Sequence, residues 1–354
     1  MMELKRPYTY DEQIDKMKSH DMILPDDNEN TKNILSSISY YRITGYSLQF
    51  RKSANDSNYV KNTSFENILR IYTFDEKLRN ILRCYIEKVE IFYRNQISYG
   101  FSISKCIQSP HDQHYDEKNY YKREEFKNII SHFEKDKDYY KDSLIVKHHK
   151  AKYNDKMPLW VMVELLSFSD VSKLYSCMYY SEQNKIANNL GISSATLINH
   201  LHCLSVLRNK CAHAARLYNT KFYPKARFNT QFLRTNKNVK SDTLFAYILV
   251  LIKRLPNNQE RQTLINEIYN VINEYKNNID LTLIGFPENY YELLNAQLST
   301  KLQSVTISKQ KTTKTTVKKL KAKKKYYVRI RTYKTVKGKK VYSSWSGVKS
   351  VKTK

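Results

Sequence analysis

Glycine is scarce in this sequence. It occurs 6 times in 354 residues, whereas average composition would give about 25. Gly-rich phosphate loops, dinucleotide-binding fingerprints and β-sandwiches with many tight turns all need glycine where other residues would be strained. The shortage therefore excludes these as the main architecture and favours helices.

Paired cysteines and long apolar runs are missing as well. The five cysteines are widely spaced and form no C-x-x-C pair, which argues against a zinc knuckle or a redox pair and favours a reducing compartment. The longest apolar run, residues 244–252, is too short for a bilayer span of about 20 residues. Residues 1–7 contain no apolar signal region. We therefore expect a cytoplasmic protein with no membrane segment, no metal and no small-molecule cofactor.

Acidic residues are absent from residues 301–354, which contain 19 Lys and Arg. The whole chain has 61 Lys and Arg against 34 Asp and Glu, a net charge of +27, so residues 1–300 keep 42 against 34, or +8. This shift in composition predicts two parts: a moderately basic body, residues 1–300, and a strongly basic tail, residues 301–354.

Helical signals begin close to the N-terminus. Thr9 and Glu12 have capping-box spacing before one helix, and a second short helix is expected over about 28–39. Gly45 is expected to break the helical pattern of the segment 39–46.

The clearest helical pattern covers residues 61–99, which contain no Gly or Pro and begin with Thr63 and Glu66 at capping-box spacing. It predicts one unusually long helix or two nearly collinear ones. Residues 105–156 are polar and are expected to form an insertion with a short helix. Later helices are predicted over 159–166, 171–180, from Ser193 or Ser194 to Cys211, 241–254 and 258–277, which makes the body all-α.

The tail has a different period. Residues 326–331 alternate in polarity at every second position, as strands do. Lys337-Gly338 lies where a turn would lead to a second strand through Val341 and Trp345. A short β-hairpin-like segment is therefore expected after the helical body.

An Arg and a His with four residues between them end the helix expected around residue 200: Arg208-Asn209-Lys210-Cys211-Ala212-His213. Residues five apart lie about 140° around an ideal helix, so the pair needs a helix end or a distortion to share a site. His213 could move the proton of a ribose 2′-OH or of the leaving oxygen, while Arg208 stabilises the phosphorane charge. Spacing alone favours a structural alternative, in which Arg208 pairs with a carboxylate and His213 caps carbonyls.

Continued through Asn219, this segment resembles the R-N-x-x-x-H motif of HEPN ribonucleases, in the form found in the Abi-like (AbiD/AbiF) abortive infection family. The resemblance implies a HEPN core at about 60–104 and 158–277, defence against phage, and RNA as the substrate. Further blocks resemble that family in the same order: residues 6–13, 38–46, 86–94, 158–166 and 285–290, with Tyr290 where Trp is more usual.

The resemblance also implies roles for single residues. Arg208 and His213 would form the catalytic pair, with Asn209 as the neighbour that orients them. The segment from Arg94 to Tyr99 is a partial echo of the motif that ends in Tyr, and no second Arg precedes a His by a similar spacing. If the site needs two motifs, a homodimer must supply the second. The residues expected to contact RNA are Arg94, Lys210 and Arg216.

Glu90 and Arg94 leave two interpretations open. At i and i+4 on the long helix they are ordinarily a salt pair. The family resemblance alone suggests instead that Arg94 faces the motif helix and helps to shape an RNA cleft.

Other histidines are weaker candidates for a site. His111 with His114, and His148 with His149, could bind metal, but no third ligand accompanies either pair, so we expect them on the solvated surface. His200 and His202 lie on opposite faces of the motif helix, and at most one of them can join the motif.

The tail resembles the final strands of a fibronectin type III domain, including its tyrosine corner, through residues such as Leu320, Tyr326 and Trp345. Such a domain needs about 90–100 residues, and its first strands are missing here. The tail is therefore a fusion remnant, a hairpin that docks on the body or another chain, or a basic arm that binds RNA phosphates. The remnant and the arm are favoured.

Three functions follow from these observations. The leading one is a metal-independent endoribonuclease of the abortive infection class that acts as a dimer. The alternative is a non-cleaving RNA-binding scaffold that forms a ribonucleoprotein with a small noncoding RNA. The third, less favoured, is a regulator that binds only proteins.

Overall fold

A computed structural model describes residues 4–298 and, further on, residues 307, 316–317, 320, 325–328, 330–336, 339–343 and 349–353. Its contacts divide the chain into two units, Met1–Ser299 and Thr300–Lys354, each of which packs mainly on itself. The first unit is mostly helical, which confirms the predicted fold class.

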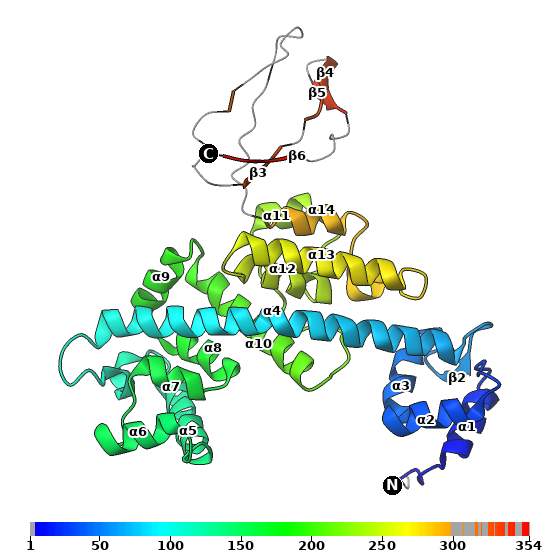
Figure 1. The fold of residues 1–354 in the computed structure, drawn as a ribbon, viewed down its shortest axis with the longest axis horizontal. Helices are drawn as coiled ribbons and strands as arrows, with labels where there is room; N and C mark the ends of the chain where they lie inside the picture. The colour runs from blue at the N-terminus through cyan, green and yellow to red at the C-terminus, as the bar shows by residue number, and fades with distance from the viewer. Residues whose placement is uncertain are drawn as a thin grey trace. The chain divides into compact units, whose positions relative to one another are not determined.

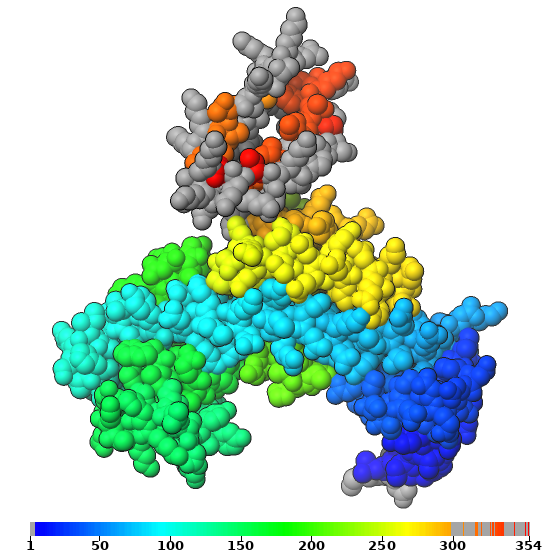
Figure 2. All heavy atoms as spheres, in the orientation of Figure 1, coloured from blue at the N-terminus to red at the C-terminus, as the bar shows by residue number. Residues whose placement is uncertain are grey.

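One helix runs through the centre of the first unit. This is α4, Phe65–Lys105, which is 41 residues long and unbroken, so the sequence pattern encodes one helix rather than two collinear ones. In Figure 1, α13 (Asn258–Tyr275) lies along one side of α4 and α10 (Ser194–Ala212) along the other, and both contact it. Packing on both sides stabilises α4 and allows it to be much longer than the average helix of about 12 residues. Figure 2 shows that one face of α4 remains exposed.

The N-terminal end consists of three short helices: α1 (Tyr10–Ser19), α2 (Asn28–Ser37) and α3 (Tyr40–Ser47). The capping box predicted for α1 is confirmed, because the side chains of Thr9 and Glu12 each accept a hydrogen bond from the other's backbone N–H. The break predicted at Gly45 is wrong. The helix α3 continues through it, since burial of Ile43 and Tyr46 offsets the about 1 kcal/mol that glycine costs inside a helix.

The capping box predicted from Thr63 and Glu66 is wrong by one residue. Ser64 is the N-cap of α4, and its hydroxyl accepts a hydrogen bond from a backbone N–H of the first turn. The Thr63 hydroxyl instead donates to the carbonyl of Val60 (2.7 Å), and the Thr63 carbonyl accepts from the N–H of Ile23 (2.9 Å). Thr63 is therefore part of the preceding loop and is not free to cap the helix.

The polar segment 105–156 contributes more to the core than the predicted insertion would. It includes α5 (Arg123–Tyr139), a helix of 17 residues. The ring of Tyr120 stacks between Phe126 of α5 and Phe101 of α4, with ring centroids 3.7 and 5.2 Å away. These buried aromatic contacts fix the segment to α4 in spite of its polar composition.

The remaining elements include the helices predicted over 159–166, 171–180 and 241–254, together with elements that were not predicted: a hairpin before α4 and short helices at 180–189, 230–235 and 290–295. In chain order the remaining elements are β1 (Arg51–Ser53), β2 (Asp56–Tyr59), α6 (Leu144–Lys152), α7 (Leu159–Leu165), α8 (Phe168–Cys177), α9 (Tyr180–Asn189), α11 (Thr230–Thr235), α12 (Leu244–Arg254) and α14 (Tyr290–Asn295). Ser193 is the N-cap of α10, as predicted. Every residue of the apolar run 244–252, which lies within α12, is buried. No single helix among the described residues has the length and hydropathy needed to cross a bilayer.

The second unit contains two antiparallel ladders: β3 (Lys325–Val328) with β6 (Lys349–Lys352), and β4 (Tyr333–Val336) with β5 (Lys339–Tyr342). The turn predicted at residues 337–338 lies outside the described residues. The strand before this turn is β4, whereas residues 326–331 were expected there. Trp345 lies outside the described residues, and the likeness to a fibronectin type III domain stays a prediction.

Candidate functional site

The R-N-x-x-x-H motif lies at the C-terminal end of α10. Arg208 occupies the last turns of the helix, and His213 is its C-cap residue, with φ −92° and ψ 17°. Because the helix ends at Ala212, the angle that separates the pair on an ideal helix no longer applies to His213. His213 is exposed, and 39% of the Arg208 side chain is accessible.

The imidazole of His213 caps no carbonyl in the described part of the chain. The backbone N–H of His213 donates to the carbonyl of Asn209 (3.0 Å), which is an ordinary helix-end contact. Within residues 4–298, no hydrogen bond or ion pair engages its ring nitrogens. The ring is therefore available to a ligand, which the structural alternative for this motif does not predict.

Glu90 connects Arg208 to the long helix. Its Oε2 lies 3.5 Å from Nε of Arg208, and its Oε1 lies 2.5 Å from a terminal nitrogen of Arg94. The Glu90 side chain is only 12% exposed, so water screens both contacts weakly. The predicted salt pair of Glu90 and Arg94 is confirmed, and Arg208 also pairs with a carboxylate, as the structural alternative for the motif expects.

The side chain of Arg94 is buried and does not face solvent near the motif helix. Its guanidinium bonds Glu90 and the carbonyl of Val163 in α7. The salt pair of the first interpretation is observed, and through Glu90 it also connects Arg94 to Arg208. The part that Arg94 would play in an RNA cleft stays a prediction. Contact with RNA is expected of Arg94, but in this position it holds Glu90 in place.

Asn209 joins the motif helix to α8. Its amide nitrogen donates to the hydroxyl of Ser169 (3.3 Å), and its amide oxygen accepts from Arg208 (3.4 Å). These two contacts restrict the rotation of both side chains at the helix end. The orienting role expected of Asn209 stays a prediction.

Lys210 and Arg216 point to different elements. Nζ of Lys210 lies 5.4 Å from the centroid of the Phe222 ring, a cation–π contact with the connection that follows α10. The guanidinium of Arg216 donates to the carbonyl of Gly45 in α3 and lies 5.9 Å from the centroid of the Tyr46 ring. Of the residues expected to contact RNA, Lys210 thus lies along the α10–α12 connection and Arg216 lies against α3.

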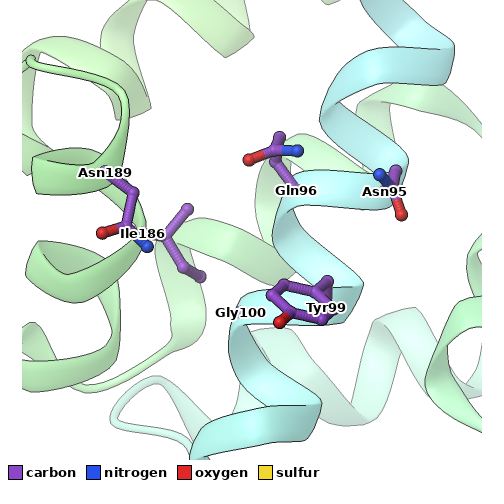
Figure 3. A pocket seen from close by; sticks show the side chains of 6 residues that line it. All are labelled: Asn95, Gln96, Tyr99, Gly100, Ile186 and Asn189. Carbon is purple, nitrogen blue, oxygen red and sulfur yellow. The ribbon is translucent and has the colours of Figure 1, made fainter.

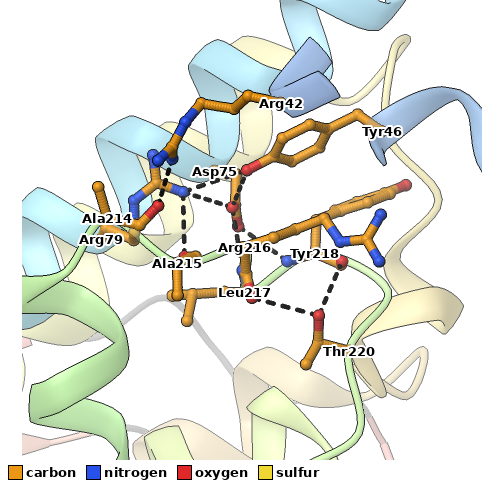
Figure 4. A network of polar contacts seen from close by, with 10 residues as sticks. All are labelled: Arg42, Tyr46, Asp75, Arg79, Ala214, Ala215, Arg216, Leu217, Tyr218 and Thr220. Carbon is orange, nitrogen blue, oxygen red and sulfur yellow. Dashed lines mark hydrogen bonds and ion pairs between the residues drawn. The ribbon is translucent and has the colours of Figure 1, made fainter. Parts of the chain in front are cut away.

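A buried carboxylate anchors the chain just after the motif, as Figure 4 shows. Asp75 of α4 is fully buried and accepts hydrogen bonds from the backbone N–H groups of Leu217 (3.0 Å) and Tyr218 (2.9 Å). The Tyr46 hydroxyl (2.6 Å) and the Arg79 guanidinium (2.5 Å) donate to the same carboxylate. Burial and the nearby Asp75 raise the pKa of Tyr46, so its hydroxyl stays protonated and donates.

The same network holds the backbone immediately after His213. Arg42 of α3 donates to the carbonyl of Ala214 (2.5 Å), and Arg79 reaches the carbonyl of Ala215 (3.5 Å). Ala214 has a φ of +49°, a left-handed conformation that is unfavourable for alanine. Hydrogen bonds from two arginines offset this strain and fix the direction in which the chain leaves His213.

Sequence reasoning missed this anchor. Asp75 and Arg79 stand four residues apart among the apolar positions of α4, where charged residues are rarely buried unless they are paired. These two charged residues within an apolar pattern were the one sign of the anchor in the sequence. Their backbone partners in residues 215–218 follow more than 130 residues later in the chain and could not be inferred from spacing.

Three of the other histidines are buried in the described part of the chain, and the prediction of a solvated surface is wrong for two of them. His114 and His149 are buried and bond the carbonyls of Met157 (2.9 Å) and Ile145 (2.8 Å). His200 is also buried, which lowers its pKa to about 3. His202 stays exposed on the motif helix. The described residues include no cluster of three or more His, Cys, Asp or Glu that could hold a metal ion.

The partial echo of the motif lines a shallow pocket of about 250 Å³ between α4 and α9, shown in Figure 3. Asn95 and Tyr99 contribute to its wall, together with Ile186 and Asn189 of α9. Arg94 does not, because its side chain points into the protein. The echo therefore brings no arginine to this pocket, and it does not form a second copy of the motif within the chain.

Contacts place the motif between the N-terminal helices and α8. The chain after His213 bonds α3 through Arg42, and Asn209 bonds α8 through Ser169. Figure 2 shows a hollow below α4 between α1–α3 and α5–α8, with the end of α10 and its connection lying between them. The guanidinium of Arg208 and the imidazole of His213 are both accessible to solvent.

The fold and the site define a class of protein: a mostly helical protein that presents an arginine and a histidine at the end of one helix. The chain belongs to the Abi-like protein family, an abortive infection family, whose model matches residues 33–219. The match extends from α2 to the end of the segment anchored by Asp75. No curated protein and no solved structure matches the chain significantly.

Proposed function

We propose that this Abi-like protein is a HEPN-type endoribonuclease that cleaves RNA without metal through Arg208 and His213. The observation that supports this most strongly is the unengaged, exposed imidazole of His213 at the end of the helix that carries Arg208. An exposed imidazole that has no hydrogen-bond partner among the described residues is available for proton transfer with a ligand.

The proposed reaction is a transesterification within the RNA. His213 removes the proton from a ribose 2′-OH, and the 2′-oxygen attacks the adjacent phosphorus. The bond from phosphorus to the 5′-oxygen then breaks, and the leaving oxygen takes up a proton, which yields a 2′,3′-cyclic phosphate and a 5′-OH. Arg208 stabilises the negative charge that builds up on the phosphorane, with Asn209 and Glu90 restricting its position.

The reaction needs a proton donor besides the base, and one chain supplies one motif. We propose that two copies form a homodimer with two-fold symmetry, in which the partner subunit's His213 protonates the leaving oxygen. The absence of an arginine from the Asn95 pocket supports this arrangement, because the echo segment cannot replace a second motif.

Incubation of RNA with the full chain in EDTA tests the proposal. We expect cleavage that leaves 2′,3′-cyclic phosphate ends, and we expect Arg208→Ala or His213→Ala to slow it by about 10²-fold or more. His202→Ala is the matched control, because His202 is exposed on the same helix. Undiminished cleavage in both motif variants would overturn the assignment of the active site.

A non-cleaving RNA scaffold is the second candidate. The observation that favours it is the ion pair of Arg208 with Glu90, which engages part of the guanidinium in the free protein. In that case Arg208 binds RNA phosphate as a structural contact. Tight co-purification with one RNA species, together with the absence of cyclic phosphate products, would distinguish this function from the first.

A further inference from the structure

The motif lies in a long stretch of the body that contains no acidic residue. Residues 183–241 include 10 Lys and Arg and no Asp or Glu, although the chain has 34 acidic residues elsewhere. This stretch covers α10 and most of the connection from α10 to α12. A surface built from it attracts polyanions without competing carboxylates of its own.

One part of this connection, Lys221 to Arg227, presents an aromatic side chain to solvent from a well-anchored backbone. Tyr223 is 64% exposed. The preceding residue, Phe222, is fully buried against Tyr247, with ring centroids 4.7 Å apart, and its N–H donates to the carbonyl of Asp242 (3.0 Å). The exposed ring therefore projects from a fixed point, and little conformational entropy is lost when a ligand binds it.

Side chains of α10 and α12 hold the rest of this segment. Asn199 donates to the carbonyl of Lys225 (2.9 Å) and accepts from the N–H of Arg227 (2.7 Å). His200 bonds the carbonyl of Arg227 (2.8 Å), and the Tyr247 hydroxyl donates to the carbonyl of Pro224 (2.6 Å). The motif helix itself thus shapes the segment that presents Tyr223.

The charged side chains of this segment are all positive, and two of the three have no ion-pair partner among the described residues. Lys225 and Arg227 are exposed, and among the described residues their side chains have no ion-pair or hydrogen-bond partner. Lys221 pairs with Asp242 at 3.2 Å, which is the one carboxylate in contact with this segment in the described part of the chain. Lys210 of the motif contacts Phe222, so the segment begins where the motif ends.

We propose that residues 221–227 form a platform for single-stranded RNA next to the cleavage site, a proposal that rests on the proposed ribonuclease function. One unpaired base stacks on Tyr223, and Lys225 and Arg227 contact the phosphates that flank it. Stacking needs a base face that is free, which an unpaired strand offers and a duplex hides. The platform therefore selects single-stranded substrates and sets which nucleotide lies at Arg208 and His213.

Binding of RNA to the full chain that carries His213→Ala tests the platform without cleavage. The probe is a fluorescein-labelled single strand of about 12 nucleotides, within the usual site sizes for such proteins, and the same strand annealed to its complement. We expect Tyr223→Ala to weaken single-strand binding about tenfold, and Tyr223→Phe to retain it, because a phenyl ring still stacks. Tyr139→Ala is the matched control, because Tyr139 is 80% exposed on α5.

A second measurement addresses the phosphate contacts. Replacement of Lys225 and Arg227 by Gln should lower the slope of log K against log salt concentration by about 1.4, since each single-strand phosphate contact contributes about 0.7. Single-strand binding that is unchanged in Tyr223→Ala, equal affinity for the duplex, or no RNA binding at low salt each overturns the platform. If binding depends on Tyr223 but the unsubstituted chain cleaves no RNA, the platform stands and the ribonuclease proposal fails.

Discussion

Glu90 is the residue through which the motif contacts the interior of the protein. The Glu90 carboxylate is mostly buried between two arginines, whose attraction offsets part of the cost of taking its charge out of water. Its contact with Arg208 lies at the surface and its contact with Arg94 lies inside. A change at this one position therefore affects both the stability of the fold and the placement of a catalytic candidate.

We expect Glu90→Gln to lower the free energy of unfolding by about 2 kcal/mol, because the buried guanidinium of Arg94 loses its counter-charge. RNA cleavage should fall more than unfolding alone explains at temperatures where the variant is folded. Urea unfolding and initial cleavage rates measure the two effects. Glu87→Gln is the control, since Glu87 is exposed one turn earlier on α4; equal behaviour of the two variants would contradict the role given to Glu90.

At the scale of elements, α4 organises the site more than the motif helix does. It supplies Glu90 to Arg208, and it supplies Asp75 and Arg79 to the chain after His213. The α3 helix adds Arg42 and packs on α4 beside these residues. The direction of the chain around His213 is thus set by two elements from the first third of the sequence.

Asp75→Asn tests this anchor. The buried Arg79 would lose its paired charge, so we expect the free energy of unfolding to fall by about 3 kcal/mol. Hydrogen exchange should accelerate at the backbone N–H groups of Leu217 and Tyr218, which bond the carboxylate directly. Glu76→Gln, at the exposed neighbouring position on α4, should leave both measurements unchanged. Unaltered exchange at these two amides in Asp75→Asn would contradict the anchoring role.

Periodicity and capping chemistry predict the elements well, because both are local. The apolar repeat identifies α4, and Ser193 marks the start of α10. The errors arise where other contacts override the local preference. Packing on α4 stabilises α3 as a continuous helix at Gly45, and the Thr63 hydroxyl bonds a loop carbonyl, so it does not cap α4.

The same limit applies to the candidate site. The motif itself can be recognised from the sequence, since Arg208 and His213 are the two ends of one six-residue segment. The pairing of Glu90 with Arg94 follows from helical spacing. Asp75 and the exposed ring of Tyr223 acquire their roles only from tertiary contacts, which no local pattern encodes.

For the whole molecule, the distribution of charge separates two basic regions. The tail contributes most of the net charge, but the acid-free stretch of the body lies at the motif. The body alone thus offers a local surface for a polyanion. Its single motif leaves the proposed reaction dependent on a second copy of the chain.

Mixed subunits test that dependence. We mix wild-type chains with excess His213→Ala chains and allow the subunits to exchange. Activity should fall more steeply than the fraction of wild-type subunits, because mixed dimers would lack one of the two imidazoles. Cleavage rates across a series of mixing ratios give the curve, and Tyr139→Ala chains serve as the neutral partner. A strictly linear decline would show that each subunit acts independently.

The hydrogen bonds of Tyr218 have a consequence for synthesis of the protein. Its hydroxyl bonds the backbone N–H (2.8 Å) and carbonyl (3.2 Å) of Asp280, and its own N–H bonds Asp75. The chain beyond His213 is therefore complete only after the ribosome has passed residue 280, which at about 5–20 residues per second takes several seconds more than synthesis of the motif itself. The chain after the motif thus acquires its final hydrogen bonds later than the motif residues themselves are synthesised.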